Sequence, residues 1–494
     1  MCNALIEEIK GEMRTAFENV ESRREILFKM SDTIFYFAEP GLREYKSAKL
    51  LVNYLRREGF KVEEGIADMP TAFIATWGEV RPEIGFFAEY DATPGHSQKP
   101  IAREEPEVYY GPGFTDAHNM LGVASCVSAA ALKATAERHG LSLKIRLLGT
   151  PAEKLCVGKP YMARDGYFDG MDAVLAWHPG GPTTVLGEVW PLAYKSMLFS
   201  FKVEAASGGQ SGDLSYPGAL DAAHAMYNNV NILKEHMAPV VRRGGSISEF
   251  MMTGGQATVA TPEHSQLVYV WRTKSLDDQE EISGMIERCG DAAALVTGCV
   301  VEKRLITAVR TGLPNLTLTN LVMRNLKAVG PPSHTEEDNE FAREIQANLG
   351  LKPMDEPYNE TIVEPEKAYD GFHPADDVNE FTWYAPTVRL YVSKSLKPPK
   401  PGYRYPRWVE SALCGTGATH RMGETAAKVL ALSAIDLVKS PDVLREARRE
   451  FNERLSIRCE PPLIPKGVKP PIDLRWPEWV DRPGSEWWIP SPKL

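Results

Sequence analysis

The stretch Leu141-Ser-Leu-Lys-Ile-Arg-Leu-Leu-Gly-Thr-Pro-Ala-Glu-Lys154 joins an apolar run to a pair of charged residues. The apolar run is typical of a β-strand, and Gly149 and Pro151 then predict a loop. Glu153 and Lys154 therefore lie where a strand meets a loop. In open α/β sheets this edge carries the ligand and catalytic groups. We expect an α/β domain with a functional site at this strand end.

The surrounding segments repeat this arrangement. Glu83 to Asp91 reads as a buried strand that ends in acids, and Asn119 to Gly140 as a helix rich in alanine and leucine. A second helix and a strand lead to His178. This alternation predicts a layered α/β domain built on a mixed sheet.

Near Ser196 the pattern changes to long strands and two amphipathic helices, and α/β patterns return from Leu313. We expect an α+β insert that interrupts the first domain. The expected domains are residues 1–195 and 313–455 for the two parts of the catalytic domain, 196–312 for the insert, and 456–494 for a C-terminal arm rich in Pro and Trp. This arm either packs its aromatic residues on a neighbouring surface or is a partly ordered tail.

Composition narrows the class of protein. The 494 residues are too many for one core, and 43% hydrophobic with 25% charged residues is ordinary for a soluble globular protein. A net charge of −10 without a basic run argues against nucleic acid or an anionic membrane as a partner. The seven scattered cysteines, the absence of a signal-peptide pattern and the absence of a membrane-spanning run predict a cytoplasmic protein.

Candidate ligands and catalytic groups recur at strand ends and helix starts. Asp91 ends a strand, Asp116 and His118 precede a helix, His178 ends another strand, and His420 opens the last long helix. Taken singly each has an ordinary explanation, such as an Asx-turn or a helix cap. Imidazole and carboxylate are the ligands that Zn²⁺ or Mn²⁺ takes, and a nearby acid such as Glu153 can accept a proton from water. Together they predict a divalent metal site with a carboxylate that can accept a proton from bound water.

These motifs resemble the aminoacylase and carboxypeptidase G family of metal-dependent amidohydrolases, in its p-aminobenzoyl-glutamate hydrolase-like branch. The resemblance covers about residues 20 to 455. It is carried by the segments Ala88-Glu-Tyr-Asp-Ala-Thr-Pro-Gly-His-Ser-Gln, His118-Asn-Met-Leu-Gly-Val-Ala, Thr150-Pro-Ala-Glu, Tyr161-Met-Ala-Arg-Asp-Gly, Asp172-Ala-Val-Leu-Ala-Trp-His-Pro and Gly330-Pro-Pro-Ser-His-Thr-Glu-Glu-Asp. It implies a mixed-sheet catalytic domain interrupted by a lid or dimerisation domain, and a homodimer or larger homo-oligomer.

The resemblance also implies residue roles. His118, His178 and His420 would be metal ligands, Glu153 the general base, and Asp91 the acid that orients a ligand. Asp116 stands where the branch usually has a cysteine, and an aspartate still binds a divalent ion.

Lys154 departs from the family, because a second metal-binding glutamate belongs at its position. A protonated lysine cannot ligate a metal and repels a second dication. We therefore expect one ion per chain, Mn²⁺ or Zn²⁺, held by Asp116, His118 and His178, with the Lys154 ammonium in place of the lost cation, near His420. Alternatively, Lys154 turns to solvent and a second ion survives on fewer ligands.

Other departures affect the chemistry. The lid segment Ser207-Gly-Gly-Gln-Ser-Gly-Asp-Leu lacks the family's carbonyl-polarising histidine, Tyr403 replaces a late histidine, and Thr258 replaces a lid asparagine. Losing an oxyanion partner costs roughly 10²–10³ in rate. These changes suggest altered chemistry, as in a divergent relative, 5-nitroanthranilate aminohydrolase, which acts on an aryl amine.

The expected function is therefore hydrolysis of a C–N bond, amide or aryl amine, in a small aromatic carboxylate. Arg272, Arg310 and Arg389 are candidates for a carboxylate clamp, although structural or surface roles are as plausible for each. The alternative is a non-catalytic small-molecule binding or assembly protein on the same fold.

Overall fold

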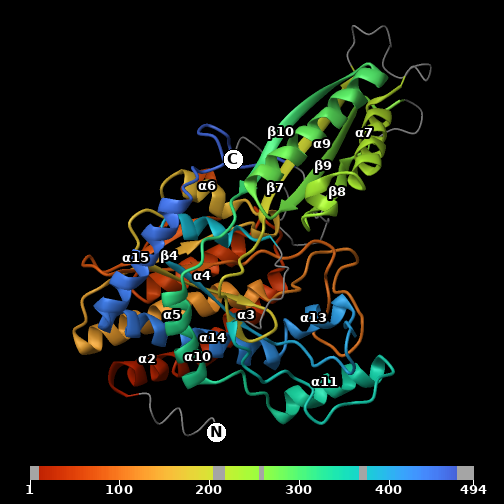
Figure 1. Cartoon of the computed structure of the whole chain (residues 1–494). Helices are drawn as coiled ribbons and strands as arrows, with labels where there is room; N and C mark the ends of the chain where they lie inside the picture. The colour runs from red at the N-terminus through yellow and green to blue at the C-terminus, as the bar shows by residue number, and fades with distance from the viewer. Residues whose placement is uncertain (1–9, 204–216, 255–260, 366–374, 475–494) are drawn as a thin grey trace.

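The computed structural model describes residues 10–203, 217–254, 261–365 and 375–474. The strands of these residues form two β-sheets (Figure 1). The first has the strand order β1-β2-β4-β3-β5-β11-β6, and the second has the order β10-β7-β9-β8. The strands are β1 (Lys61–Glu64), β2 (Phe73–Trp77), β3 (Glu83–Ala88), β4 (Lys144–Gly149), β5 (Ala173–Pro179), β6 (Thr184–Val185), β7 (Ala193–Val203), β8 (Ser246–Thr253), β9 (His264–Thr273), β10 (Cys299–Val309) and β11 (Thr387–Val392).

The first sheet is mixed, which confirms the expected fold class. Strands β4, β3, β5 and β11 run parallel, and β1, β2 and β6 pair antiparallel at its edges. Its central strands β3, β5 and β11 are buried along their whole length, as the continuous apolar runs require. The carboxyl ends of the parallel strands meet at one edge, where the candidate residues lie.

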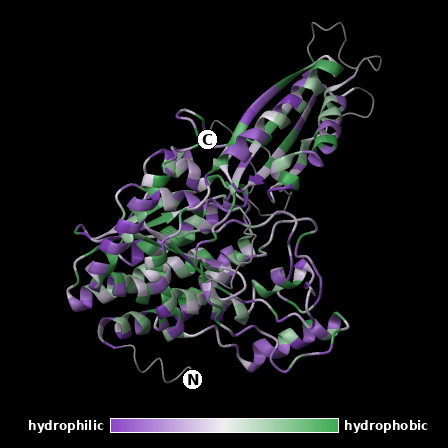
Figure 2. Cartoon of the chain, in the orientation of Figure 1, coloured by the Kyte–Doolittle hydropathy of each residue, from purple (hydrophilic) through white to green (hydrophobic). Residues whose placement is uncertain are grey.

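Helices cover this sheet. Outside the region of the second sheet, the α-helices of the described residues are α2 (Gly11–Glu21), α3 (Arg24–Phe37), α4 (Tyr45–Arg57), α5 (His118–His139), α6 (Gly158–Arg164), α10 (Leu316–Val329), α11 (Glu336–Asn348), α13 (Arg407–Leu413), α14 (Gly417–Lys439) and α15 (Pro441–Ile457), and short 3₁₀ turns are η1 (Ile66–Asp68), η2 (Glu153–Leu155) and η4 (Asp377–Trp383). Helices α5 and α14 pack on each other and on the sheet, and both are largely buried. Hydrophobic residues gather in this interior (Figure 2).

Close packing at one glycine brings α5 to the end of β3. A Cβ on Gly122 would lie 2.7 Å from the carbonyl oxygen of Glu89. Only glycine allows the helix to approach the strand end so closely. This contact places His118, at the start of α5, beside Glu89 and Asp91.

The second sheet is antiparallel and projects from the part of the molecule that is built on the first sheet (Figure 1). Helices α7 (Ala219–Lys234) and α9 (Leu276–Thr297) pack on it, and α8 (Ala238–Val241) is a single turn. Its own core includes Phe199, Tyr269, Trp271 and Ile286. This sheet spans residues 193–309, and the domain limits given above remain predictions.

After α15 the chain continues without regular structure to Leu474 and lies on the catalytic domain. Arg164 donates to the carbonyl oxygen of Val468, and Arg43 donates to those of Ile472 and Leu474. The tryptophans of the arm, Trp476, Trp479, Trp487 and Trp488, lie outside the described residues. Within the described residues, no helix is both long and apolar enough to cross a membrane.

Candidate metal and catalytic site

Four chain segments meet at the carboxyl edge of the first sheet. Asp91 follows β3, His118 begins α5, Glu153 and Lys154 form the 3₁₀ turn after β4, and His178 lies near the end of β5. The structure thus brings together five of the residues singled out from the sequence, together with Asp116 in the loop before α5.

Two alanines shape the turns that carry these groups. Ala117, between Asp116 and His118, has φ 50°, and Ala152, before Glu153, has φ 57°. This left-handed backbone conformation costs about 1–2 kcal/mol for a residue with a Cβ. At Ala152 the N–H donates to the buried Glu44 carboxylate over 2.7 Å, which holds the turn in place. Backbone strain of this kind is typical of functional sites.

The Lys154 ammonium occupies the centre of the outer part of the site. Its Nζ donates to Glu153 Oε2 at 2.7 Å and to Asp116 Oδ2 at 2.8 Å, and it lies 3.0 Å from His118 Nε2. The lysine side chain is 15% exposed. A tethered cation therefore lies among three side chains that could otherwise surround a metal ion. Because Lys154 binds these groups and His420 lies elsewhere, the expected proximity of the two is not found.

Asp91 supports both neighbouring turns. Its Oδ1 accepts from His118 Nδ1 at 2.8 Å, and its Oδ2 accepts from the backbone N–H of Lys154 at 2.8 Å. Because Asp91 accepts a hydrogen bond from the Nδ1–H group of His118, the Nε2 atom of His118 faces the site. This contact agrees with the orienting role that the resemblance implies for Asp91.

Next to the ammonium, two imidazole nitrogens face each other. His118 Nε2 and His178 Nε2 are 3.3 Å apart, and His178 Nδ1 donates to the carbonyl oxygen of Pro179. The buried Glu89 Oε2 atom makes no hydrogen bond and lies 3.2 Å from His118 Nε2. Two facing imidazole nitrogens beside a carboxylate oxygen without a hydrogen-bond partner form a donor set that suits a divalent cation. Glu89, His118 and His178 therefore fit a divalent metal ion, which would supply Lewis acidity if bound there.

A second layer of charge lies behind these residues. The fully buried Lys159 Nζ donates to Glu89 Oε1 at 2.6 Å and to Asp377 Oδ1 at 2.5 Å. Arg389 donates to Asp376 at 2.5 Å. Together these groups form the charged cluster: Glu89, Asp91, Asp116, His118, Glu153, Lys154, Lys159, His178, Asp376, Asp377 and Arg389.

The charged cluster holds six carboxylates against three permanently basic side chains, an excess that favours binding of a cation. Burial raises the pKa of Glu153 to about 7, and Asp376 adds to the effect while Lys154 opposes it. A carboxyl group with this pKa is suited to accept a proton near neutral pH.

The two histidines are shifted in opposite directions. Burial opposes the charge on His118, yet the surrounding carboxylates, with Asp116 the largest contributor, raise its pKa to about 9. Burial and the Arg389 guanidinium hold the pKa of His178 well below its usual range. Positive charge is therefore attracted to the His118 side of the pair, while His178 keeps a free lone pair.

The structure does not bring His420 to the charged cluster. His420 lies on α14, where its Nε2 is 2.7 Å from Asp32 Oδ1 and its ring stacks on Phe28. These contacts account for the residue without a metal. The site can be assembled from Glu89 instead, which stands two residues before Asp91 at the same strand end.

The three candidate clamp arginines lie in different surroundings. Arg310 is buried against Glu380, and its guanidinium lies over the Trp383 ring. Arg389 is buried inside the charged cluster with Asp376. Both therefore have structural partners.

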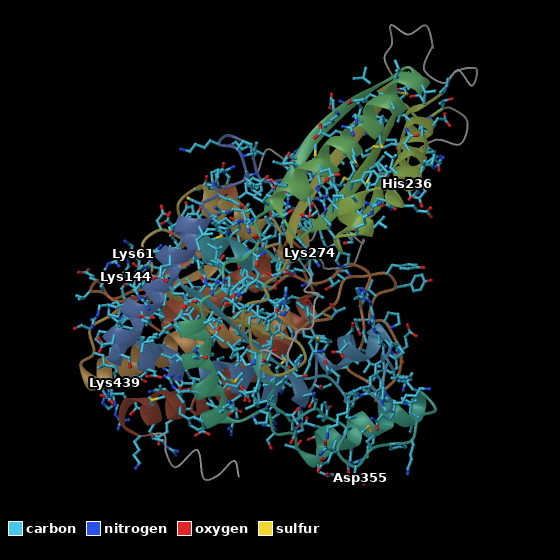
Figure 3. The ribbon with its side chains drawn as sticks, in the orientation of Figure 1. Lys61, Lys144, His236, Lys274, Asp355 and Lys439 are labelled. Atoms are coloured by element: carbon cyan, nitrogen blue, oxygen red, sulfur yellow. The ribbon has the colours of Figure 1, made fainter. Side chains whose placement is uncertain are left out.

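Arg272 belongs to β9 of the insert and donates to Ser248 Oγ at 3.3 Å. It lies close to Lys274, which marks the junction of the insert with the catalytic domain in Figure 3. The lid segment 207–214 and Thr258 lie outside the described residues, so their departures remain sequence observations.

Sequence reasoning missed four members of the charged cluster. Glu89 was available in the same strand-end segment as Asp91, since both follow a buried strand. Lys159, Asp376 and Asp377 had no such signal, because the partners of Lys159 are 70 and 218 residues away along the chain.

Comparisons with known proteins find similar hydrolases and similar folds, although no protein-family model matches the chain. The chain is 29% identical to a component of the p-aminobenzoyl-glutamate hydrolase of Escherichia coli (strain K12), over 91% of this chain and 97% of that protein. It is 27% identical to the Xaa-Arg dipeptidase of Homo sapiens, over 92% of this chain and 95% of that protein.

Two solved structures share the fold. An aminobenzoyl-glutamate utilization protein from Klebsiella pneumoniae has a TM-score of 0.55 at 13% identity and covers 84% of this chain and 98% of its own. A putative aminohydrolase from methicillin-resistant Staphylococcus aureus has a TM-score of 0.56 at 14% identity and covers 86% and 99%. The match to the p-aminobenzoyl-glutamate hydrolase component confirms the resemblance that the sequence motifs indicate, and the two solved structures confirm the fold.

Proposed function

We propose that this chain, a member of the aminoacylase and carboxypeptidase G family of amidohydrolases, hydrolyses a C–N bond of a small aromatic carboxylate with one divalent metal ion. The observation that carries this proposal is the pair of facing imidazoles, His118 and His178, beside the unpartnered oxygen of Glu89. Glu153 lies next to that pair, with its Oε2 3.6 Å from His118 Nε2.

In this proposal Glu89, His118 and His178 hold the ion, with Asp116 Oδ2 4.0 Å from His178 Nε2 as a further carboxylate. A bound divalent ion, Zn²⁺ or Mn²⁺, supplies Lewis acidity to water and to the substrate. Glu153 takes the proton from the attacking water and passes it to the leaving nitrogen.

Lys154 takes the part of the second cation. Its ammonium is partly exposed and already lies among Asp116, Glu153 and His118. There it holds Glu153 in place and offers a positive charge to the oxygen that gains negative charge during attack. This contribution compensates in part for the histidine that the lid sequence lacks.

The second candidate is a non-catalytic binding protein on the same fold. The Lys154 contact at 2.7 Å favours it, because an ion pair lowers the basicity of Glu153. The raised pKa of Glu153, about 7, and the open set of Glu89, His118 and His178 favour catalysis. We therefore place hydrolysis first.

Turnover by the purified full-length chain tests the proposal. The protein is loaded with Mn²⁺ or Zn²⁺ and assayed on p-aminobenzoyl-glutamate, dipeptides and aryl amines that carry a carboxylate. We expect release of amine or ammonia from at least one aromatic carboxylate, abolished by a chelator and by Glu153→Gln. Binding without turnover of any member of the panel would support the non-catalytic candidate instead.

A further inference from the structure

A recess of about 370 Å³ lies beside the loop that carries Asp91 and Asp116. Its lining includes two tyrosines and one tryptophan, Tyr109, Tyr110 and Trp408, together with His96 and Arg407. We call it the aromatic recess. Its volume lies within the roughly 300–1,000 Å³ that small-molecule sites occupy.

The two tyrosines of this recess are unusually accessible, whereas Trp408 is partly buried. Tyr109 and Tyr110 are 75% and 72% exposed, and their ring centroids are 4.3 Å apart. Tyr110 also has a φ of 56°, a strained conformation for a residue with a side chain. Adjacent aromatic rings that remain exposed on a strained loop mark a binding surface for a planar apolar group.

Arg407 supplies the charge in the aromatic recess. It is exposed, and within the described part of the chain it has neither an ion-pair partner nor a side-chain hydrogen bond. Arg310 and Arg389 by contrast are buried against carboxylates. A planar guanidinium without a partner is suited to bind a carboxylate through two parallel hydrogen bonds.

Two observations connect this recess to the charged cluster. Burial and the Arg407 guanidinium lower the pKa of His96, which is half-buried in the recess lining, while the Asp116 carboxylate opposes the shift. The buried Lys394 ammonium binds Glu410 Oε2 at 2.7 Å and lies 3.5 Å from the Thr115 carbonyl oxygen. Lys394 thus links helix α13, which carries Arg407, to the loop before Asp116.

We propose that the aromatic recess binds the aromatic carboxylate part of the substrate, with its carboxylate on Arg407 and its ring against Tyr109, Tyr110 and Trp408. Glu104, exposed on the same rim, offers an acceptor to an amine or hydroxyl on the ring. This assignment rests on the proposed function, because it names the part of the substrate that the hydrolase recognises.

The test measures binding separately from turnover. Isothermal titration uses the full-length Glu153→Gln protein loaded with Mn²⁺, with 4-aminobenzoate, aniline and cyclohexanecarboxylate as probes. Arg407→Gln is compared with Arg404→Gln, because Arg404 is an exposed arginine of the same segment that does not line the recess. Trp408→Leu tests the contact with the ring.

We expect Arg407→Gln to weaken 4-aminobenzoate binding at least tenfold and to leave aniline binding unchanged, while Arg404→Gln alters neither. Trp408→Leu should weaken 4-aminobenzoate more than cyclohexanecarboxylate. Equal affinities in the two arginine variants, or no binding of 4-aminobenzoate at millimolar concentration, would overturn the assignment.

The same proteins with Glu153 intact separate this proposal from the proposed function. If turnover is the same with and without Arg407→Gln, hydrolysis is supported, and the proposal that the aromatic recess binds the substrate is wrong. Binding that depends on Arg407, without turnover of any substrate, would support the recess and count against hydrolysis.

Discussion

Two lysines five residues apart, Lys154 and Lys159, make the same kind of contact in very different surroundings. Each ammonium bridges two carboxylates: Lys154 joins Asp116 to Glu153, and Lys159 joins Glu89 to Asp377. Lys159 and its partners are fully buried, whereas the Lys154 side chain is 15% exposed.

This difference in exposure indicates different roles for the two lysines. Lys159 is fully buried behind the sheet edge, where it neutralises Asp377 and holds Glu89, a proposed metal ligand, in place. Lys154 lies at the partly exposed side of the candidate site, in contact with Asp116, Glu153 and His118. Ion pairs of similar geometry therefore stabilise the fold in one place and shape a reactive centre in the other.

The largest expected difference in kcat is between a substitution of Glu153, which pairs with Lys154, and one of Asp377, which pairs with Lys159. Glu153→Gln keeps the size and most hydrogen bonds of the side chain but cannot accept a proton, so we expect a 10²–10⁴-fold loss of kcat. Asp377→Asn is the matched control, because Lys159 keeps Glu89, and its kcat should stay within about tenfold of wild type. Steady-state kinetics measures both. Equal losses would show that the two ion pairs do not differ in role.

The free energy of unfolding should also differ between variants that lack one or the other ammonium group. Lys159→Met leaves two buried carboxylates without their cation, and we expect a loss of about 3–5 kcal/mol in the free energy of unfolding. Lys154→Met should cost clearly less, since water can reach Asp116, which is 31% exposed. Urea unfolding followed by circular dichroism gives both values, and a larger cost at Lys154 would reverse the assignment.

The pH profile tests the influence of Lys154 on Glu153. The base works only when ionised, so kcat/KM should fall about tenfold per pH unit below the pKa of about 7. Because the ammonium favours the ionised carboxylate, Lys154→Met should raise this pKa and move the acid limb to higher pH. If the acid limb of the Lys154→Met variant stayed at the same pH or moved to lower pH, a group other than Glu153 would control it.

Much of the site could be predicted, because it depends on local pattern. Strand ends followed by acids or histidines identified Asp91, Glu153 and His178, and the end of the loop before α5 identified Asp116 and His118. These residues are close in space because parallel strands share one carboxyl edge.

The rest depends on contacts between distant parts of the chain. Nothing at the start of α14 distinguishes a ligand from a residue that binds Asp32, as His420 does. Likewise, Arg310 and Arg389 could not be separated from exposed arginines without knowing that Glu380 and Asp376 lie beside them. The periodicity of a sequence does not show which side chains are buried or which residues tens to hundreds of positions apart form ion pairs.

Metal content is the most direct test of the central claim, that Lys154 replaces one of two cations. The full-length chain and its Lys154→Glu variant are saturated with Mn²⁺ or Zn²⁺, freed of excess ion by gel filtration and analysed by mass spectrometry for metal per chain. One ion in the wild type and two in Lys154→Glu is the predicted result. Two tightly bound ions in the wild-type chain would contradict it.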